Sequence, residues 1–525
     1  MSAAYAPGTR MLFQGILRAT GLRLRTGLVG DGLALLSGAL MVLAFAPFNL
    51  YPLAIITLAA LFWLLNDISV RRAFWRGFLF GVAEFTFGVY WLYISIHDIA
   101  DAPVWLSCII IAGLVAVMAL YSGLACAVTI WLTPHAGWRR RILVLPALWT
   151  LFEWLRGWLL TGFPWLSLGY SQIDNVLKGF APLFGVYGVT LAVALSAGLL
   201  LGVLAMKATL VKRLIYLGAL GAIWVTGGIL AAVSWTHPSG PPIQVSLMQG
   251  NIPSTIKWDP QSFKPTLDLY RRMTEEHWSS RLIVWPESAV PDYADEVWDD
   301  YLGPLEKQAL AHGTELFIGT PTEDATTGAA YNSVISLGGH DGVYSKRHLV
   351  PLSEYFPLPM WARRWLESMS LPYSSFTRGA ADQPLLEAAG YKVGVSICYE
   401  DAYGNEIMRA LPQAAFLVNV SDDGWFGESI ALPQHFEIAR MRALETGRYL
   451  LRDTNTGITG IIDAKGEVIT SLPSNTRGVL QGVVVPYAGS TPYQYIGNAG
   501  VVILSLLFLV ISGWASGQLR RKPGP

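Results

Sequence analysis

The stretch Gly394-Val395-Ser396-Ile397-Cys398-Tyr399-Glu400-Asp401 decides how the second half of the chain folds and which chemistry it can perform. It lies on a short apolar run, Val393–Tyr399, that predicts a buried β-strand. A cysteine thiolate is a nucleophile that needs a base or a cation nearby, and Glu400 and Asp401 by themselves would raise the thiol pKa. Cys398 is therefore either a nucleophile that requires a neighbouring cation or a buried structural cysteine, which is a common alternative.

Two further strand ends hold residues that can serve such a cysteine. Glu287 ends the apolar run Leu282–Glu287, and a carboxylate at a partly desolvated strand end has a raised pKa that suits a general base. Lys346 lies in the segment Tyr344–Pro351, where its ammonium can face a developing oxyanion and offset the acidic residues beside Cys398. The alternatives are a turn glutamate and a solvated basic loop.

Strand and helix patterns alternate between residues 237 and 494. This alternation predicts an α/β domain whose sheets are largely buried. The predicted strands are Ile243–Asn251, Leu282–Glu287, Leu316–Thr320, Val393–Tyr399 and Phe416–Ser421, and the predicted helices are Pro260–Trp278 and Gln434–Gly447, the second ended by its glycine.

The remainder of the chain is much more apolar. Hydrophobic residues make up 53% of the whole sequence and charged residues 14%, whereas soluble domains are about a quarter charged. Eight stretches approach the roughly 20 residues that cross a bilayer. They are Leu28–Phe48, Tyr51–Leu65, Gly77–Ile96, Val104–Leu132, Ile142–Leu160, Ala181–Met206, Leu214–Trp235 and Asn498–Trp514.

Basic residues follow every even-numbered stretch, and this pattern predicts the orientation. A seven-span arrangement would break the alternation, so we expect eight spans with both termini in the cytoplasm. Residues 1–25 are then a cytoplasmic lead-in and not a removed signal peptide. The basic residues are Arg71, Arg72, Arg76, Arg139, Arg140, Arg141, Lys207, Lys212, Arg213, Arg520, Arg521 and Lys522.

This topology divides the chain into three parts. Residues 1–236 form a membrane domain of seven helices, residues 237–494 an extracytoplasmic catalytic domain, and residues 495–525 a last membrane helix with a cytoplasmic tail. Cys108 and Cys126 lie in apolar runs, so no disulfide framework is predicted. The net charge of zero gives no electrostatic reason to expect nucleic-acid binding.

A few polar and aromatic residues stand out in the membrane part. Glu153 and Arg156 are one helical turn apart, which predicts an ion pair with either a structural or a headgroup-binding role. Glu84 needs a partner on another helix. The segment Phe163-Pro164-Trp165 predicts an aromatic belt at the membrane surface or, as the alternative, the wall of a lipid access route.

The order Glu287, Lys346, Cys398, with each residue near a strand end, resembles that of the nitrilase superfamily. The resemblance implies a four-layer α-β-β-α sandwich. It also implies that Glu287 is the general base, that Lys346 stabilises the tetrahedral intermediate and that Cys398 is the nucleophile that becomes acylated.

Over nearly its whole length the chain also resembles the apolipoprotein N-acyltransferases, a membrane-embedded family within that superfamily. Eight spans around an inserted nitrilase-like domain carry part of this resemblance. The other part rests on the segments Gln249–Pro253 with Trp258, Trp285–Glu287, Lys346–Pro351, Glu354–Pro357, Cys398–Glu400, Asp423–Gly427, Gln434–Arg448 and Thr454–Gly457.

Four supporting residues follow from this resemblance. Glu354 would be a second carboxylate that positions Lys346 or the thiol. Tyr399 and Glu400 would support the pocket, and Trp258 would lie on a mobile arm near the lipid entrance.

The chain departs from the pattern of the family at two aspartates. Asp422 stands where many relatives are expected to have asparagine, and Asp453 stands where a small residue is usual. We expect both to affect neighbouring loops and neither to touch the three catalytic candidates.

The resemblance implies acyl transfer in two half-reactions without a cofactor or a metal. The sn-1 acyl chain of a phospholipid, by resemblance phosphatidylethanolamine, would pass to Cys398 and then to the amine of a diacylglyceryl-cysteine lipoprotein. The expected enzyme is a monomer in the bacterial inner membrane, with membrane lipids as its surroundings and its catalytic domain on the periplasmic side.

Two other functions use the same sequence features. A membrane-tethered amidase of the nitrilase type would employ the same three residues, although the spans and the apolar loop residues Trp361, Trp425 and Phe426 favour a lipid substrate. A transporter with a sensor domain would need a polar path through paired broken helices, and the spans contain few ionisable residues.

Overall fold

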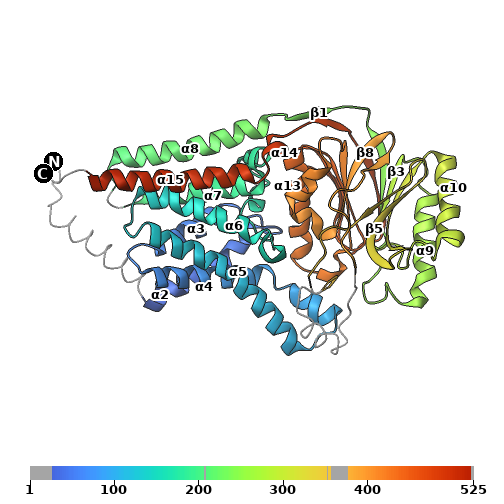
Figure 1. Cartoon of the computed structure of the whole chain (residues 1–525), viewed down its shortest axis with the longest axis horizontal. Coiled ribbons are helices and arrows are strands. Elements are labelled where there is room, and N and C mark those ends of the chain that lie inside the picture. The colour runs from blue at the N-terminus through green and yellow to red at the C-terminus, as the bar shows by residue number, and fades with distance from the viewer. Residues whose placement is uncertain (1–26, 206–207, 352, 356–375, 522–525) are drawn as a thin grey trace, which may run out of the picture.

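The computed structural model of the chain describes residues 27–205, 208–351, 353–355 and 376–521, so the basic lead-in and Trp361 lie outside the described residues. Two parts follow one another along the longest axis (Figure 1). One is a bundle of helices, and the other is a domain of sheets and helices. The chain enters the sheet domain after α8 and leaves it before α15.

Each apolar stretch identified in the sequence overlaps a helix of the bundle. Short helical turns, among them Ile94–Ile99 and Arg140–Val144, lie beside these helices. The bundle helices are α2 (Gly27–Met41), α3 (Pro52–Leu64), α4 (Val70–Gly88), α5 (Val104–Leu132), α6 (Leu145–Arg156), α7 (Ala181–Leu204), α8 (Leu210–Ala232) and α15 (Ala499–Arg521).

Among the described residues, four helical segments are long and apolar enough to cross a membrane by themselves: Gly27–Ala44, Val104–Leu132, Val176–Leu204 and Leu210–Ala232. The apolar helix α3 and the apolar part of α15 are shorter, and α6 has only 12 residues. Helix α4 begins at Val70, earlier than predicted, because the side chain of Ser69 caps it by accepting a hydrogen bond from the N–H of Arg72. The basic residues of its first turns therefore belong to the helix.

Glycines let α4 and α5 approach each other closely. A Cβ atom on Gly77 would lie 2.5 Å from the carbonyl oxygen of Ser122, and a Cβ on Gly81 would lie 2.7 Å from the Cα of Ala119. Helices in lipid associate through close packing because lipid tails are as apolar as leucine. The small residues on α4 therefore allow this helix pair to pack tightly.

Large apolar side chains remain exposed on the outside of the bundle. Helices α8 and α15 run along its edge (Figure 1), and Leu210, Val225 and Trp514 on these helices are each more than 60% exposed. An apolar surface of this extent requires an apolar environment. The exposed faces therefore fit a protein that is surrounded by lipid.

The second part contains two sheets of six strands each, with strand orders β13-β2-β3-β4-β5-β6 and β12-β11-β10-β9-β8-β7. The central strands β2, β3 and β4 pair in parallel, as do β8, β9 and β10. The strands are β2 (Ile243–Gln249), β3 (Leu282–Trp285), β4 (Glu315–Asp324), β5 (Ala329–Leu337), β6 (Gly342–Ser345), β7 (Leu386–Ala388), β8 (Tyr391–Ile397), β9 (Phe416–Ser421), β10 (Leu450–Thr454), β11 (Thr459–Ile462), β12 (Val468–Leu472) and β13 (Gly478–Val484).

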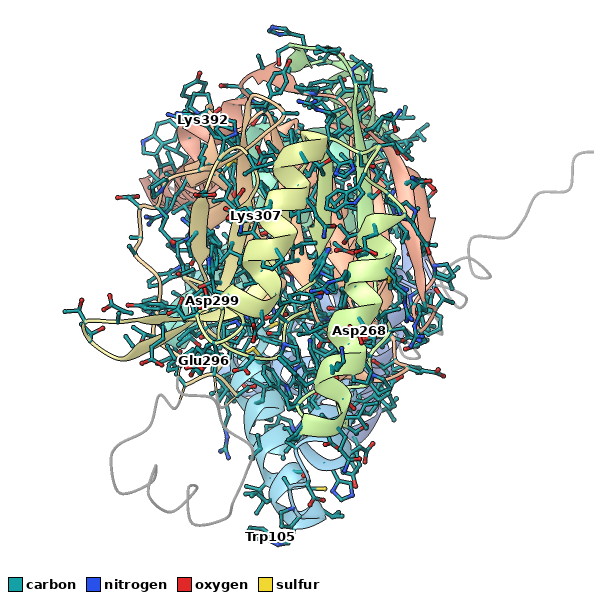
Figure 2. All side chains as sticks on the ribbon, turned by 90° about the vertical axis from the view of Figure 1, so that its right-hand side faces the viewer. Trp105, Asp268, Glu296, Asp299, Lys307 and Lys392 are labelled. Atoms are coloured by element: carbon teal, nitrogen blue, oxygen red, sulfur yellow. The ribbon has the colours of Figure 1, made fainter. Side chains whose placement is uncertain are left out.

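Helices cover the outer faces of both sheets, which gives the predicted α-β-β-α layers. Helices α9 (Pro260–Glu275) and α10 (Gly303–His312) lie on the side far from the bundle, and Figure 2 shows Asp268 and Lys307 on them. Helix α13 (Ala431–Thr446) lies between the other sheet and the bundle (Figure 1). It ends at Gly447 in a left-handed conformation, as the sequence predicts.

The two connections between the parts pair with each other. Strand β1 (Thr236–Pro238) leads into the sheet domain, and β14 (Tyr487–Gly489) leads out of it. They form an antiparallel ribbon with Thr236 opposite Gly489. A short helix, α14 (Pro492–Ile496), then leads into α15.

Candidate active site

Three predicted residues meet where strands of the two facing sheets end. Glu287 follows β3 and Lys346 follows β6 in one sheet, while Cys398 follows β8 in the other. The side chains of Glu287 and Lys346 and the residue Cys398 are all more than nine-tenths buried. The predicted strands before Glu287 and Cys398 overlap β3 and β8, which each end two residues earlier than predicted, and no strand was predicted before Lys346. The packing of two sheets face to face brings the residues together.

An ion pair at this point joins Lys346 to two carboxylates. The Nζ of Lys346 lies 3.1 Å from the Oε1 of Glu287 and 2.8 Å from the Oε1 of Glu354. Burial disfavours the charge on Lys346, but Glu287 and Glu354 outweigh this effect and raise its pKa well above the usual value. Lys346 is therefore a fixed cation.

Asn332 completes this arrangement and was missed in the sequence. Its Nδ2 donates to the Oε1 of Glu287 at 2.8 Å and to the Oε1 of Glu354 at 3.1 Å. The signal in the sequence is an asparagine inside strand β5, where the neighbouring residues are buried or apolar. Glu354 also accepts a hydrogen bond from the N–H of Val350 at 2.7 Å, which fixes its second oxygen.

Glu287 is held in its ionised form. Burial acts to raise its pKa, but the Lys346 ammonium and the hydrogen bonds from Asn332 and the N–H of Asp422 lower it below the usual value. The N–H of Asp422 lies 2.9 Å from the Oε2 of Glu287. Glu287 is thus a carboxylate that can accept a proton, although its pKa is lowered and not raised as predicted.

The contact with Asp422 corrects a second expectation. Asp422 does touch the catalytic candidates, because it begins the loop after β9 and its backbone reaches Glu287 across the two sheets. Its carboxylate also pairs with Lys257, whose Nζ donates to the carbonyl oxygen of Glu287 at 2.9 Å. Lys257 was missed in the sequence, where the only hint is its place beside Trp258. Asp453 lies elsewhere, and its Oδ2 accepts from the N–H of Met248.

Cys398 is buried in a strained turn. Its φ of 53° is left-handed, and the helical turn Cys398–Ala402 begins at this residue. Its carbonyl oxygen accepts a hydrogen bond from the Nδ2 of Asn419 at 3.2 Å. Burial, followed by the Glu287 carboxylate, raises the pKa of the thiol well above its usual value, while Lys346 lowers it. Cys398 therefore rests as a thiol beside a carboxylate and an ammonium.

The two acidic neighbours of Cys398 do not control its pKa as the sequence suggested. Glu400 accepts from the N–H of Ile397 at 2.7 Å, the hydroxyl of Tyr344 at 2.9 Å and the N–H of Arg347 at 2.6 Å. Asp401 binds a different buried group. Glu400 therefore joins the strand that ends at the nucleophile to the loop that carries Lys346.

Asp401 belongs to a buried group of four ionisable residues that the sequence did not reveal. His435 lies between Asp401 and Asp423, at 3.0 Å and 2.9 Å, and Arg452 binds the same two carboxylates. Burial and the neighbouring Arg452 guanidinium disfavour the charge on His435, but the two carboxylates outweigh them and raise its pKa. Arg452 also donates to the Oδ1 of Asn419 at 2.6 Å, so this group supports the turn at Cys398 from behind.

A loop of the bundle packs against the same turn. Trp165 is only 1% exposed, its ring stacks on Tyr399 at 6.3 Å, and its Nε1 donates to the Oε1 of Gln434 at 2.7 Å. The hydroxyl groups of Tyr399 and Tyr403 both face the carbonyl oxygen of Gly162. The prediction of an aromatic belt is therefore wrong for Trp165, which is buried between the two parts.

The predicted ion pair between Glu153 and Arg156 is also wrong, because none of the ion pairs among the described residues joins them. Arg156 donates to the carbonyl oxygens of Phe163 at 2.8 Å and Trp165 at 2.5 Å. Glu153 accepts from Trp149, Leu168 and Thr190. Both residues thus hold the loop that packs on Tyr399. Glu153 and Arg156 also line a small cavity together with Glu84.

Trp258 lies apart from this buried cluster. Its side chain is 54% exposed at the end of the turn that Lys257 attaches to Asp422 and Glu287. The structure therefore places it at the surface, one residue from a group that contacts the site.

The chain matches two family models. The apolipoprotein N-acyltransferase N-terminal domain matches residues 37–199, and the carbon-nitrogen hydrolase domain matches residues 244–493. The structure of Nit3 from Saccharomyces cerevisiae, a member of the nitrilase superfamily, is 18% identical with a TM-score of 0.36, and the match covers 48% of this chain and 93% of that one.

Curated relatives match both parts of the chain. An apolipoprotein N-acyltransferase of Methylococcus capsulatus is 45% identical over 89% of this chain and 92% of its own length. One of Nitrosomonas europaea is 42% identical over 92% of this chain and 97% of its own length. Because these matches extend over nearly all of the bundle and the sheet domain, the chain belongs to the apolipoprotein N-acyltransferase family.

Proposed function

We propose that this protein transfers a fatty acyl group from a phospholipid to the N-terminal amine of a diacylglyceryl-cysteine apolipoprotein. The relatives reported above are named apolipoprotein N-acyltransferases, which supports acyl transfer to the amine of an apolipoprotein. The observation that carries the proposal for this chain is the buried meeting of Glu287, Lys346 and Cys398 beside a helical bundle with an exposed apolar surface.

In the first half-reaction Glu287 takes the proton of the Cys398 thiol, and the sulfur attacks the sn-1 ester carbonyl of the phospholipid. Phosphatidylethanolamine is the donor that the family resemblance suggests. A C–S bond forms, the ester C–O bond breaks, and Glu287 returns the proton to the departing oxygen of the lysophospholipid. The acyl group then remains on Cys398 as a thioester.

Lys346 and the backbone N–H of Tyr399 stabilise the oxyanion of this step. Lys346 is a fixed cation, and the first N–H groups of a helical turn lack acceptors within that turn. In the second half-reaction the lipoprotein amine attacks the thioester, the C–S bond breaks and an amide forms. The two substrates therefore react in turn, which predicts ping-pong kinetics.

The bundle gives this chemistry access to lipid. Each CH₂ group that stays in the bilayer contributes about 0.8 kcal/mol, so extracting two acylated substrates into water would be costly. We propose that all eight helices cross the inner membrane, with residues 1–236 and 495–525 as its membrane parts. The sheet domain, residues 237–494, then lies on the periplasmic side of a monomeric enzyme.

The positions of the arginines support this orientation. Arg139, Arg140 and Arg141 precede α6, whereas Arg156 at its other end binds the loop that packs on the sheet domain. The arginine cluster therefore lies at the end of α6 that is far from the sheet domain. Such clusters favour the cytoplasmic side.

Labelled phospholipid tests the proposal. Purified protein in detergent is given a phospholipid with a fluorescent sn-1 chain, and we expect a fluorescent protein band that hydroxylamine removes. Cys398→Ser should give no such band, while Cys108→Ser should behave as the unaltered protein. A hydroxylamine-sensitive band on the Cys398→Ser variant would contradict the nucleophile assignment. Release of free fatty acid without transfer to a diacylglyceryl peptide would instead indicate a hydrolase.

A further inference from the structure

Ser421, the last residue of β9, lies beside the nucleophile that follows the neighbouring strand β8. The two strands are parallel, and Ser396 is opposite Asn419 in their register. Side chains two residues apart point to the same face of a strand, and neighbouring strands lie about 4.8 Å apart. The next pair on this face is therefore Cys398 and Ser421.

Hydrogen bonds on this face show that the paired residues are in contact. The Nδ2 of Asn419 donates to the Oγ of Ser396 at 3.0 Å and to the carbonyl oxygen of Cys398 at 3.2 Å. The side chain of Ser421 is a hydrogen-bond partner of the Cys398 thiol. Ser421 is fully buried, so water cannot take its place at the sulfur.

A hydrogen-bond donor at the sulfur favours the charged form of the cysteine. Burial and the Glu287 carboxylate raise the pKa of the Cys398 thiol well above its usual value, whereas Lys346 and the hydrogen bond of Ser421 act in the opposite direction. The Lys346 ammonium is already shared between two carboxylates. The Ser421 hydroxyl is thus a second group that can stabilise a negative charge on the sulfur.

The proton of this hydroxyl points away from the sulfur while Cys398 is a thiol. The Oγ of Ser421 donates to the Oδ1 of Asp423 at 2.7 Å. A serine hydroxyl has only one proton to donate, and an ionised carboxylate is a much stronger acceptor than a neutral thiol. The resting hydroxyl therefore binds the carboxylate.

Asp423 can release this hydrogen bond without being left unpaired. The Nδ1 of His435 lies 2.9 Å from its Oδ1, and Arg452 donates to its Oδ2 at 2.9 Å. A thiolate that forms beside the same hydroxyl is a charged acceptor, and hydrogen bonds to charged groups are about twice as strong as neutral ones. The hydroxyl can therefore turn to the sulfur as soon as the thiol loses its proton.

We propose that Ser421 is a catalytic residue whose hydroxyl turns from Asp423 to the Cys398 sulfur whenever that sulfur is negatively charged. In the first half-reaction Glu287 takes the thiol proton, and Ser421 donates a hydrogen bond to the thiolate until the C–S bond forms. In the second half-reaction the C–S bond breaks and its electron pair stays on the sulfur, to which Ser421 donates again. The proton that the acceptor amine loses ends on the sulfur, and Ser421 keeps its own proton throughout.

The catalytic part of this inference rests on the proposed function, so the experiment also measures the sulfur directly. Ser421→Ala is compared with Ser396→Ala in the purified full-length protein in detergent. Ser396 is a buried serine on the same face of the neighbouring strand, and its hydroxyl accepts from Asn419, so it is the matched control. Alkylation of Cys398 by iodoacetamide is followed by mass spectrometry from pH 7 to pH 9.5.

We expect Ser421→Ala to alkylate about fivefold more slowly than the unaltered protein throughout this range, because less thiolate forms without the donor. Labelling by fluorescent phospholipid should slow by about tenfold, and so should transfer from the isolated acyl-enzyme to a diacylglyceryl-cysteine peptide, because the sulfur becomes negative in both steps. Ser396→Ala should match the unaltered protein in all three measurements.

Equal alkylation of Ser421→Ala and the unaltered protein would overturn the contact with the sulfur. An equal loss in Ser396→Ala would also overturn it, because any buried hydroxyl on this face would then have the same effect. Slow alkylation of Ser421→Ala with unchanged acylation and transfer would overturn its catalytic role. If the unaltered protein forms no acyl-enzyme, the proposed function fails and this role fails with it, while the alkylation rates still decide whether Ser421 stabilises the thiolate.

Discussion

The backbone N–H of Asp422 donates to the Oε2 of Glu287 at 2.9 Å, so a loop of one sheet holds the carboxylate that follows a strand of the other. The other oxygen of Glu287 binds Lys346 and Asn332 within its own sheet. Glu287 therefore keeps its orientation only while the two sheets stay packed together. This dependence makes the site sensitive to changes in either sheet.

Replacing Glu287 by glutamine should remove the proton acceptor of the first half-reaction while keeping the size of the side chain, although one accepting oxygen, bonded either to Lys346 and Asn332 or to the N–H of Asp422, becomes an NH₂ group. We expect acyl-enzyme formation to fall by about 10²-fold or more. The measurement is the initial rate of protein labelling by fluorescent phospholipid. Glu323→Gln, at an exposed carboxylate in β4, is the control. Unchanged labelling of Glu287→Gln would exclude Glu287 as the base.

The pair between Lys257 and Asp422 should be necessary for stability. Both residues are at most 5% exposed, so Lys257→Met leaves a buried carboxylate without its cation and should destabilise the fold by about 3–5 kcal/mol. Combining it with Asp422→Asn removes that charge and should restore part of the loss. Thermal unfolding in detergent measures both effects. A double variant less stable than Lys257→Met would contradict this account.

The thiol of Cys398 should react slowly with iodoacetamide at neutral pH. Burial and Glu287 raise its pKa, so the thiolate increases only well above the ordinary cysteine pKa of about 8.5. Acylation by phospholipid should instead persist in mild acid, because the lowered pKa of Glu287 keeps the base ionised there. Alkylation rates from pH 6 to pH 9, followed by mass spectrometry, test the first statement. An alkylation rate that levels off near neutral pH would contradict it.

Glu437 on α13 should make the fold less stable as the pH rises. Burial raises the pKa of Glu437 from 4.5 to about 8, although a hydrogen bond from the N–H of Ala46 and the charge of Arg440 lower it. The folded state therefore binds this proton more tightly than the unfolded state, and stability declines between these two pH values by up to about 1.4 kcal/mol per pH unit.

Glu437→Gln keeps the uncharged form at every pH, so it should raise the melting temperature at pH 8.5 and have little effect at pH 5. The test is to measure the melting temperatures of the unaltered protein and of Glu437→Gln at pH 5 and at pH 8.5. Equal shifts at both values would show that Glu437 does not carry the proton.

The family resemblance implies that Trp258 lies near the lipid entrance, so we expect it to matter for the lipid substrate. Its side chain is 54% exposed, so we do not expect the fold to depend on it. Trp258→Ala should leave the melting temperature within about 1 °C, since exposed substitutions change stability little, while acylation by phospholipid slows. Trp298→Ala, at another partly exposed tryptophan on the far helical layer, is the matched control. Unchanged acylation by Trp258→Ala would remove it from the site.

Much of the site could be predicted from strand ends. Glu287 and Cys398 each follow an apolar run that forms a parallel strand, β3 in one sheet and β8 in the other, so each lies at the carboxyl edge of its sheet. Lys346 follows the short strand β6, which was not predicted. The exposed apolar helices likewise follow directly from composition. These predictions succeed because the pattern of apolar residues within a strand or a helix indicates whether that element is buried.

The remaining parts of the site depend on contacts between segments that are distant in sequence. Lys257 and Asp422 form an ion pair across two sheets, and the sequence of neither loop indicates the other as its partner. His435 and Arg452 resemble ordinary charges of a helix and a strand, yet both are fully buried against Asp401 and Asp423. Trp165 resembles an interfacial residue because its sequence cannot show the domain that covers it.

The ribbon of β1 and β14 has a mechanical consequence. Both strands leave the bundle at one place, so the covalent connections between the two parts lie side by side. The hydrogen bonds of Tyr399 and Tyr403 to the carbonyl oxygen of Gly162 connect the two parts at a second place. Contacts at both places limit how far Cys398 can move relative to the bundle, so a substrate has to reach the sulfur without a large displacement of the sheet domain.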